Sequence, residues 1–379
     1  MTKTRLPLRI AGLDLLRSLA ILAVLVSHGR HFVTPYIAEL EHLRLFGFFG
    51  VELFFVLSGF LIGSILLRGV EGFDQRKNLT AFLLRRWLRT LPNYYLFLAI
   101  NGLVALVLGQ AIPHFFAYLF FLQNIADRHP AFFGEAWSLA VEEWFYLCFS
   151  VSLCLALMLK RSLSMFLILV LIFMTVPTIL RVWWVTMFDP SWDEGVRKIV
   201  VLRLDAVMFG VAFALVKKYF PGFWRRRQLD ALILGVVILT GCGTFFAVTD
   251  LDHSWFARTF LFTLTSVGFS ALIPFCDNAS NFRRRIVTVV VQNIAAWSYS
   301  MYLTNLLAFT LVMRVLGDRH GKVFLLDGVG LLCFALICML SSALIYRYFE
   351  YPILCFRDEF SKRQFATRYA SARYNQPTA

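Results

Sequence analysis

Long apolar stretches recur along this chain at lengths that suit membrane-crossing helices. A bilayer core needs about 20 apolar residues per helix. Stretches of this kind lie near residues 10–30, 46–68, 89–109, 135–158, 163–187, 199–217, 229–249, 256–275, 289–313 and 323–347. The apolar segment 113–124 is too short to cross, so we expect a re-entrant or interfacial helix there. The pattern predicts an all-α fold, a polytopic membrane helix bundle with about ten transmembrane helices, the last ending near Glu350 and Pro352.

The composition agrees with a membrane protein. Apolar residues make up 59% of the 379 positions and charged residues 16%, and the mean hydropathy is +0.70. Soluble domains carry about 45–50% apolar and about 25% charged residues. Six of the seven cysteines fall in apolar runs and none forms a Cys-x-x-Cys pair, so we predict neither a disulfide framework nor a metal site.

The positive charge of the chain is explained by membrane topology. The net charge is +14, from 37 Lys and Arg against 23 Asp and Glu. These basic residues lie between the apolar runs rather than on one face, which argues against a nucleic-acid partner. With the N-terminus inside, 25 of them fall on the inner side and 10 on the outer side, so the positive-inside rule predicts that both termini are cytoplasmic. We therefore expect one transmembrane domain, residues 1–356, and a flexible polar cytoplasmic tail, residues 357–379.

Ionisable groups in the first span are the first candidates for function, because charges inside a membrane are costly and usually face a bundle interior. Arg17 and His28 are eleven residues apart, so they share a helix face about 16 Å apart along the axis. A cation could hold an anionic donor at the inner end while a base meets an acceptor at the outer end. Two alternatives stay open: Asp14 and Arg17 form a structural ion pair, or His31 is the functional histidine.

Two further spans carry polar groups. Glu52 and Ser58 lie in an otherwise apolar second span, where packing alone does not explain a carboxylate. Arg86 and Arg89 share one helix face, and two guanidinium groups at that spacing can grip a phosphate or a pyrophosphate. Contact with anionic lipid headgroups is the alternative for this Arg-x-x-Arg pair.

A polar stripe enters the fourth span, where Glu135, Ser138, Glu142 and Tyr146 are offset by 0, 3, 7 and 11 residues and so lie on one helix face. These side chains could orient a histidine, bind sugar hydroxyls or pair with an intramembrane arginine such as Arg203. Smaller signals come from the Arg203-x-Asp205 pair, whose members do not face one another, and from the stripe Ser298, Tyr302 and Asn305.

In their order along the chain, these motifs resemble the membrane acyltransferase-3 family, which includes bacterial O-antigen and other cell-envelope O-acetylases. The resemblance runs from about residue 10 to 355. It rests on Asp14-x-x-Arg17 with His28, Gly50-Val51-Glu52-x-Phe54-Phe55-x-Leu57-Ser58-Gly59-Phe60, Arg86-x-x-Arg89-x-x-Pro92, Trp137-Ser138-Leu139-x-x-Glu142-Glu143-x-Phe145-Tyr146, Arg203-x-Asp205, Ser298-Tyr299-x-x-Tyr302-Leu303 and Glu350-x-Pro352.

The resemblance implies an O-acyltransferase in a bacterial cytoplasmic (inner) membrane. The acyl group, most often acetyl, would pass from cytoplasmic acyl-coenzyme A as co-substrate to a hydroxyl of an envelope carbohydrate. His28, Arg17 and Glu142 would be catalytic, and Arg86, Arg89 and Arg17 would bind the acyl-coenzyme A. The supporting or acceptor-binding residues would be Asp14, Glu52, Ser58, Trp137, Ser138, Glu143, Tyr146, Arg203, Asp205, Tyr302 and Asn305.

Two positions depart from the family pattern. Asn305 stands where many members have histidine, and Glu52 replaces the more frequent aspartate. The first change puts a proton-handling role at that position in doubt, while the second keeps the carboxylate.

A transporter or flippase for an anionic or lipid-linked sugar is the alternative function, with the same charges lining a path. Such proteins often contain inverted repeats with broken helices, and the sequence shows no repeat of this kind. A purely structural or sensor role would leave the ordered intramembrane charges unexplained.

Overall fold

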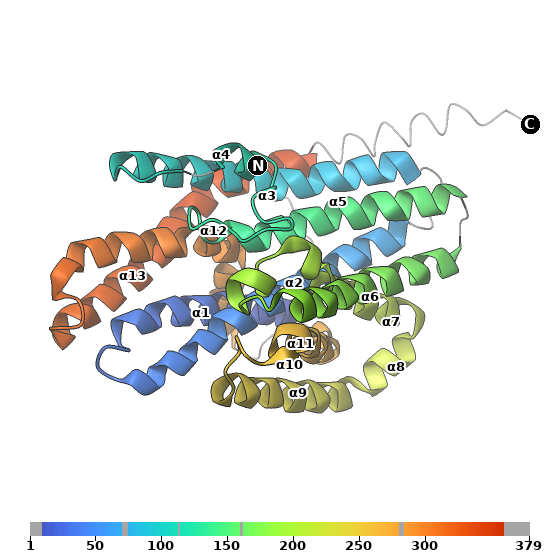
Figure 1. Cartoon of the computed structure of the whole chain (residues 1–379). Helices are drawn as coiled ribbons and strands as arrows, with labels where there is room; N and C mark the ends of the chain where they lie inside the picture. Colours follow the sequence, from blue (N-terminus) through green and yellow to red (C-terminus); the bar gives the residue numbers. More distant parts are fainter. Residues whose placement is uncertain (1–9, 70–74, 113, 160–161, 280–283, 360–379) are drawn as a thin grey trace, which may run out of the picture.

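The computed structural model describes residues 10–69, 75–112, 114–159, 162–279 and 284–359, which form helices and connecting loops. The α-helices are α1 (Ala11–Gly29), α2 (Arg44–Gly69), α3 (Gln75–Val107), α4 (Phe115–Leu119), α5 (Ala136–Leu159), α6 (Leu163–Phe188), α7 (Leu204–Tyr219), α8 (Pro221–Arg226), α9 (Gln228–Val248), α10 (Trp255–Thr259), α11 (Leu261–Asn278), α12 (Arg285–Leu316) and α13 (Phe324–Ile345). Short 3₁₀ helices span Arg30–Phe32, Ala38–Leu43, Val200–Leu202 and Gly317–Arg319, and π-helical turns span Asp193–Arg197 and Tyr346–Glu350. The predicted all-α membrane bundle is confirmed (Figure 1).

Each predicted span contains an α-helix, but two of these ten helices do not meet the length and hydropathy expected of a membrane crossing. Among the described residues, eight helices are long and apolar enough to span a membrane. The two others are α7, of 16 residues, and α11, of 18 residues. The count of ten is therefore not confirmed.

Several boundaries differ from the prediction. The third span begins earlier, because α3 starts at Gln75, and the predicted re-entrant segment contains only the five-residue α4. The expected end of the last helix near Glu350 and Pro352 is wrong, since the chain passes through a π-helical turn and stays helical to residue 359. The wider π turn moves Pro352 out of register with the regular α-helical hydrogen bonds, so it does not stop the helix. The N-terminal basic residues and most of the predicted tail, 360–379, lie outside the described residues.

Helix α2 lies at the centre of the bundle and packs along α7 and α1. Figure 1 shows α9 at one edge of the bundle and α3 near the opposite edge. In the outer helices α6, α9 and α13, only 17%, 17% and 22% of the residues in the apolar stretch are buried, as expected for helices that face lipid. The polar residues of the candidate site lie on the inner helices.

The contact between α2 and α7 requires glycine. A Cβ atom placed on Gly210 would lie 2.0 Å from the carbonyl oxygen of Val56, and one on Gly59 would lie 1.8 Å from that of Val207. Small residues let helix backbones approach this closely in membranes. The paired glycines therefore set the distance between the two central helices.

We predict that Gly210→Ala lowers the stability of the protein by about 1–3 kcal/mol, because the two helices must separate to admit the methyl group. Gly241→Ala on α9 is the matched control, since no atom lies within 4 Å of its added Cβ, and it should be neutral or stabilising by up to about 1 kcal/mol. Thermal unfolding of the purified protein in detergent measures both, and equal melting temperatures for the two variants would contradict the prediction.

Candidate functional site

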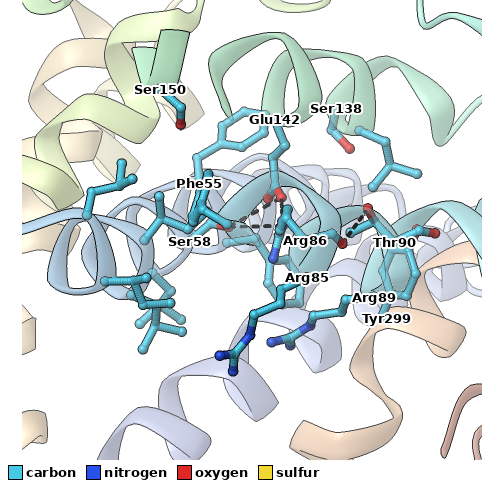
Figure 2. A pocket seen from close by; sticks show the side chains of 18 of the residues that line it. Phe55, Ser58, Arg85, Arg86, Arg89, Thr90, Ser138, Glu142, Ser150 and Tyr299 are labelled. Atoms are coloured by element: carbon cyan, nitrogen blue, oxygen red, sulfur yellow. Dashed lines mark hydrogen bonds and ion pairs between the residues drawn. The ribbon is translucent and has the colours of Figure 1, made fainter. Parts of the chain in front are cut away.

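A cavity of about 790 Å³ opens among α1, α2, α3, α5 and α12 (Figure 2). Seven of the sixteen residues predicted for the site line it. They are Arg17, Ser58, Arg86, Arg89, Ser138, Glu142 and Tyr302. The sequence patterns thus identified a real cluster, although its members come from five helices.

The middle of the cavity holds a tight group of four side chains. The Arg86 guanidinium donates to Glu142 Oε2 at 2.7 Å and to the Tyr146 hydroxyl at 2.6 Å, and it lies 4.2 Å from the centre of the Tyr146 ring. The Tyr146 hydroxyl also forms short hydrogen bonds with Glu142 and Ser58. Arg86 supplies the counter-charge that a carboxylate needs inside an apolar bundle. We refer to these four residues as the central cluster.

The predicted stripe on α5 is confirmed as a single face, and it reaches a second stripe on α12. Ser138 hydrogen-bonds Tyr302 at 2.6 Å, and both side chains line the outer part of the cavity. Glu135 stands just before α5, where its Oε1 accepts from the Leu306 amide at 3.0 Å. Glu143 follows Glu142 in the sequence but is not part of the stripe. Its Oε1 accepts a hydrogen bond from the Thr90 hydroxyl at 2.8 Å.

Arginines also line the end of the cavity that the predicted topology would place on the cytoplasmic side, and we call this end the arginine mouth. Arg17, Arg85, Arg89 and Arg357 all contribute to the wall there. Arg85 and Arg89 point away from Glu142, whereas Arg86 points toward it (Figure 2). The two members of the Arg-x-x-Arg pair therefore have different surroundings.

The ion pair left open for the first span is present but long. Arg17 NH1 lies 4.0 Å from Asp14 Oδ1, and 22% of the Arg17 side chain is exposed. Asp14 is buried. Arg17 also lines the cavity, so it can both pair with Asp14 and face a ligand there.

His28 lies at the outer end of α1 and is not among the described residues that line the cavity. Its ring makes no hydrogen bond to a described residue, and the charged groups close enough to act on it include Arg30, Arg197 and Lys198. His31, the rival candidate, packs its ring 5.3 Å from that of Phe309. The structure thus keeps His28 and the arginine mouth at opposite ends of α1, as the spacing predicts.

Fully buried ion pairs surround the site. Arg203 pairs with Glu52 at 2.5 Å, and both side chains are 0% exposed. Asp205 pairs with Arg181 at 2.9 Å. The two residues of Arg203-x-Asp205 accordingly have separate partners, and the carboxylate that Arg203 meets is that of Glu52 rather than one from the α5 stripe. Arg181 was not singled out from the sequence, although a lone arginine inside an apolar run is the signal that marks it.

Asn305 and Trp137 are buried beside the cavity rather than in its wall. The Asn305 amide donates to the Tyr302 carbonyl oxygen, and its own Oδ1 is buried without a hydrogen-bond partner among the described residues. The Trp137 carbonyl oxygen accepts from Asn124 at 3.1 Å. Asn305 thus contacts Tyr302 of the cavity wall, and the Trp137 ring lies 6.0 Å from that of Phe55, which also lines the cavity.

Arg197 is a second residue that the sequence patterns missed. It ends the π-helical turn Asp193–Arg197, and its guanidinium lies 4.9 Å from the centre of the Trp137 ring. Burial raises the pKa of Asp193, but the charges of Arg197 and Lys198 outweigh it and lower the pKa to about 2. The charge of Arg197 also acts on His28 and on Tyr302, so Arg197 lies near both. π-Helical turns often mark functional sites, but no simple sequence pattern predicts them.

No group of three or more His, Cys, Asp or Glu that could hold a metal ion occurs among the described residues. The chemistry available in this part of the chain is that of arginines, carboxylates, hydroxyls and histidine. Such a set can bind a polyanion, polarise a carbonyl group and move a proton.

The fold and the cavity define a polytopic membrane protein. Its cavity leads from the arginine mouth to the Glu142 carboxylate and the Tyr146 hydroxyl. A family model described as an acyltransferase domain matches residues 10–347, so the chain belongs to the acyltransferase-3 family.

Relatives with assigned names are O-acetyltransferases. The chain is 26% identical over 335 residues to the peptidoglycan O-acetyltransferase OatA of Listeria monocytogenes, covering 83% of this chain and 52% of that protein. It is 31% identical over 339 residues to the putative peptidoglycan O-acetyltransferase YrhL of Bacillus subtilis, covering 83% of this chain and 48% of that protein. The chain thus spans about half the length of these relatives. No solved structure matches it.

We predict that breaking the Glu52–Arg203 pair from one side is costly and that removing both charges is not. Glu52→Leu should lower stability by about 3–5 kcal/mol, because it leaves the Arg203 charge buried without a counter-ion. The double variant Glu52→Leu, Arg203→Met should recover most of that loss. Thermal unfolding in detergent compares them, and a double variant as unstable as the single one would contradict this account.

Proposed function

We propose that this protein is an O-acyltransferase of a bacterial cytoplasmic (inner) membrane. It transfers an acyl group, most often acetyl, from cytoplasmic acyl-coenzyme A to a hydroxyl of a cell-envelope carbohydrate. The observation that carries the proposal is the single cavity that joins the arginine mouth to the central cluster in a chain of the acyltransferase-3 family. The names of OatA and YrhL support a glycan acceptor.

The donor binds at the arginine mouth. Coenzyme A carries a pyrophosphate and a 3′-phosphate, and guanidinium groups bind phosphates through paired, charge-assisted hydrogen bonds. Arg17, Arg85, Arg89 and Arg357 supply these groups at the cytoplasmic end of the cavity. Arg86, which the sequence assigned to the donor together with Arg89, instead holds the Glu142 carboxylate in place.

The acceptor meets the acyl group toward the outer end. There His28 acts as general base on the acceptor hydroxyl, or carries the acyl group briefly. In the direct reaction the hydroxyl oxygen bonds to the thioester carbonyl carbon, the carbon–sulfur bond breaks, and the hydroxyl proton passes through His28 to the departing thiolate. Glu142 and Tyr146 orient the thioester when the donor first binds, before its carbonyl carbon reaches His28 for the transfer.

Transfer of label from radiolabelled acetyl-coenzyme A by the purified protein tests this function. We expect His28→Ala to abolish transfer to the acceptor, because no other group would take the hydroxyl proton, while His42→Ala, at an exposed position, leaves it unchanged. His31→Ala is the third variant. Full activity of a well-expressed His28→Ala protein would refute the assignment, and loss of activity in His31→Ala alone would move it to the rival histidine.

Mass spectrometry of envelope glycans from a deletion strain provides the cellular test. Glycans that lose an acyl increment when the gene is absent support the acyltransferase. Unchanged acylation with altered export of the glycan would favour the transporter alternative.

The two arginines of the Arg-x-x-Arg pair should separate kinetically. Arg89→Gln should raise the KM for acyl-coenzyme A about tenfold or more with little change in kcat, because one charge-assisted hydrogen bond to phosphate contributes about 1.5–3 kcal/mol. Arg86→Gln should lower kcat about 100-fold with a nearly constant KM, because it frees Glu142 and Tyr146 from their fixed geometry.

Steady-state kinetics with varied acyl-coenzyme A measures both parameters. Arg314→Gln, at an exposed position on α12, is the matched control and should change neither. An Arg86→Gln variant whose defect lies in KM alone would show that Arg86 binds the donor after all.

A further inference from the structure

The cavity continues past the central cluster into a part with a different chemical character. Here the walls are aliphatic or aromatic side chains from three helices, which we call the apolar arm. It is lined by Leu61 and Ile62 of α2, Leu79 and Phe82 of α3, and Leu153 and Leu157 of α5. Ser150, which marks this part of the wall, lies on the other side of Glu142 from Ser138 and Thr90 (Figure 2). The proposed functions of the arginine mouth and of the Ser138 and Tyr302 hydroxyls do not explain why the cavity has this apolar part.

Most of the described side chains of the apolar arm are buried, whereas Ile65, which also lines the cavity on α2, is 52% exposed. Ile62, Leu153 and Leu157 are 3%, 4% and 2% exposed, and Phe82 is 9% exposed. A groove formed only by lipid-facing side chains would leave these residues far more accessible. The arm therefore belongs to the site rather than to the lipid surface.

The arm offers almost nothing to a polar ligand. Ser150 contributes a hydroxyl to its wall, and that oxygen is buried without a hydrogen-bond partner among the described residues. The pantetheine part of coenzyme A carries two amides, and a buried amide without a partner is costly. Pantetheine is thus a poor occupant, whereas a hydrocarbon chain needs no partner and gains from burial.

The arm begins where the thioester would lie. Ser58 and Leu61 share one face of α2, and Tyr146, Ser150 and Leu157 follow one another along the cavity side of α5. From Tyr146 to Leu157 the helix rises by about 16 Å. A chain attached to a carbonyl carbon held at the central cluster can enter the arm directly.

We propose that the apolar arm binds the hydrocarbon chain of the donor, so that the enzyme uses aliphatic acyl-coenzyme A substrates longer than acetyl-coenzyme A. This inference rests on the proposed function and specifies its donor. The bond changes are those of the direct reaction above, with the longer acyl group in place of acetyl. Each methylene that enters the arm should favour the donor about fourfold until the arm is full.

The test compares acetyl-, butyryl-, octanoyl- and dodecanoyl-coenzyme A with the purified protein, by release of the coenzyme A thiol and by label transfer. We expect kcat/KM to be higher for butyryl- or octanoyl-coenzyme A than for acetyl-coenzyme A by about tenfold or more. A preference for acetyl-coenzyme A, or equal use of all four, would overturn the inference and assign the arm to a bilayer lipid. Absence of turnover with every donor would instead refute the proposed function itself.

Two variants connect the preference to the arm. Ser150→Phe places a ring near its entrance and should lower the octanoyl-to-acetyl ratio of kcat/KM about tenfold, while Leu157→Ala lengthens the arm and should shift the optimum to a longer chain. Leu155→Phe is the matched control, because Leu155 is on the same helix but 57% exposed, and its ratio should equal that of the parent. The ratio is independent of how much protein folds, and a ratio unchanged in both arm variants would refute the inference.

Discussion

A charge inside this bundle has to meet a counter-charge, and that requirement organises the site. Arg203 meets Glu52 with both side chains fully buried, and Arg86 meets Glu142 in the cavity wall with 15% of each side chain exposed. Burying either member alone would cost several kcal/mol. The pairs therefore fix how α2 sits against Arg203 at the start of α7 and how α3 sits against α5, and the cavity is the space that remains between these helices.

The pairing also divides the cavity into regions of different chemistry. Because Arg86 is held by Glu142 and Tyr146, a polyanionic donor is left with the arginines at the mouth, such as Arg17 and Arg89. Beyond the central cluster one direction leads to the hydroxyls of Ser138 and Tyr302, and another leads into the apolar arm. A thioester substrate, with a charged end, a reactive carbonyl and an apolar end, has the same order of properties.

His28 stands apart from this arrangement, at the other end of α1. Arg197 lies near this histidine and near Tyr302 of the cavity wall, and it is held by its contacts with Trp137 and Asp193. The proposed reaction thus draws on groups at both ends of one helix. The part that matches this chain makes up 52% of OatA and 48% of YrhL.

The sequence by itself determined the helices, their apolar character and the stripe from Ser138 to Tyr146, because hydrophobic length and helical spacing are local properties of the chain. It also pointed to the charged residues, since a charge in an apolar run is visible without a structure. Only the tertiary structure decided which charges pair. Arg86 and Glu142 are 56 residues apart, and their contact depends on how the helices pack. The π-helical turn that carries the last helix past Glu350, and the apolar arm, were hidden for the same reason: both arise from contacts among several helices.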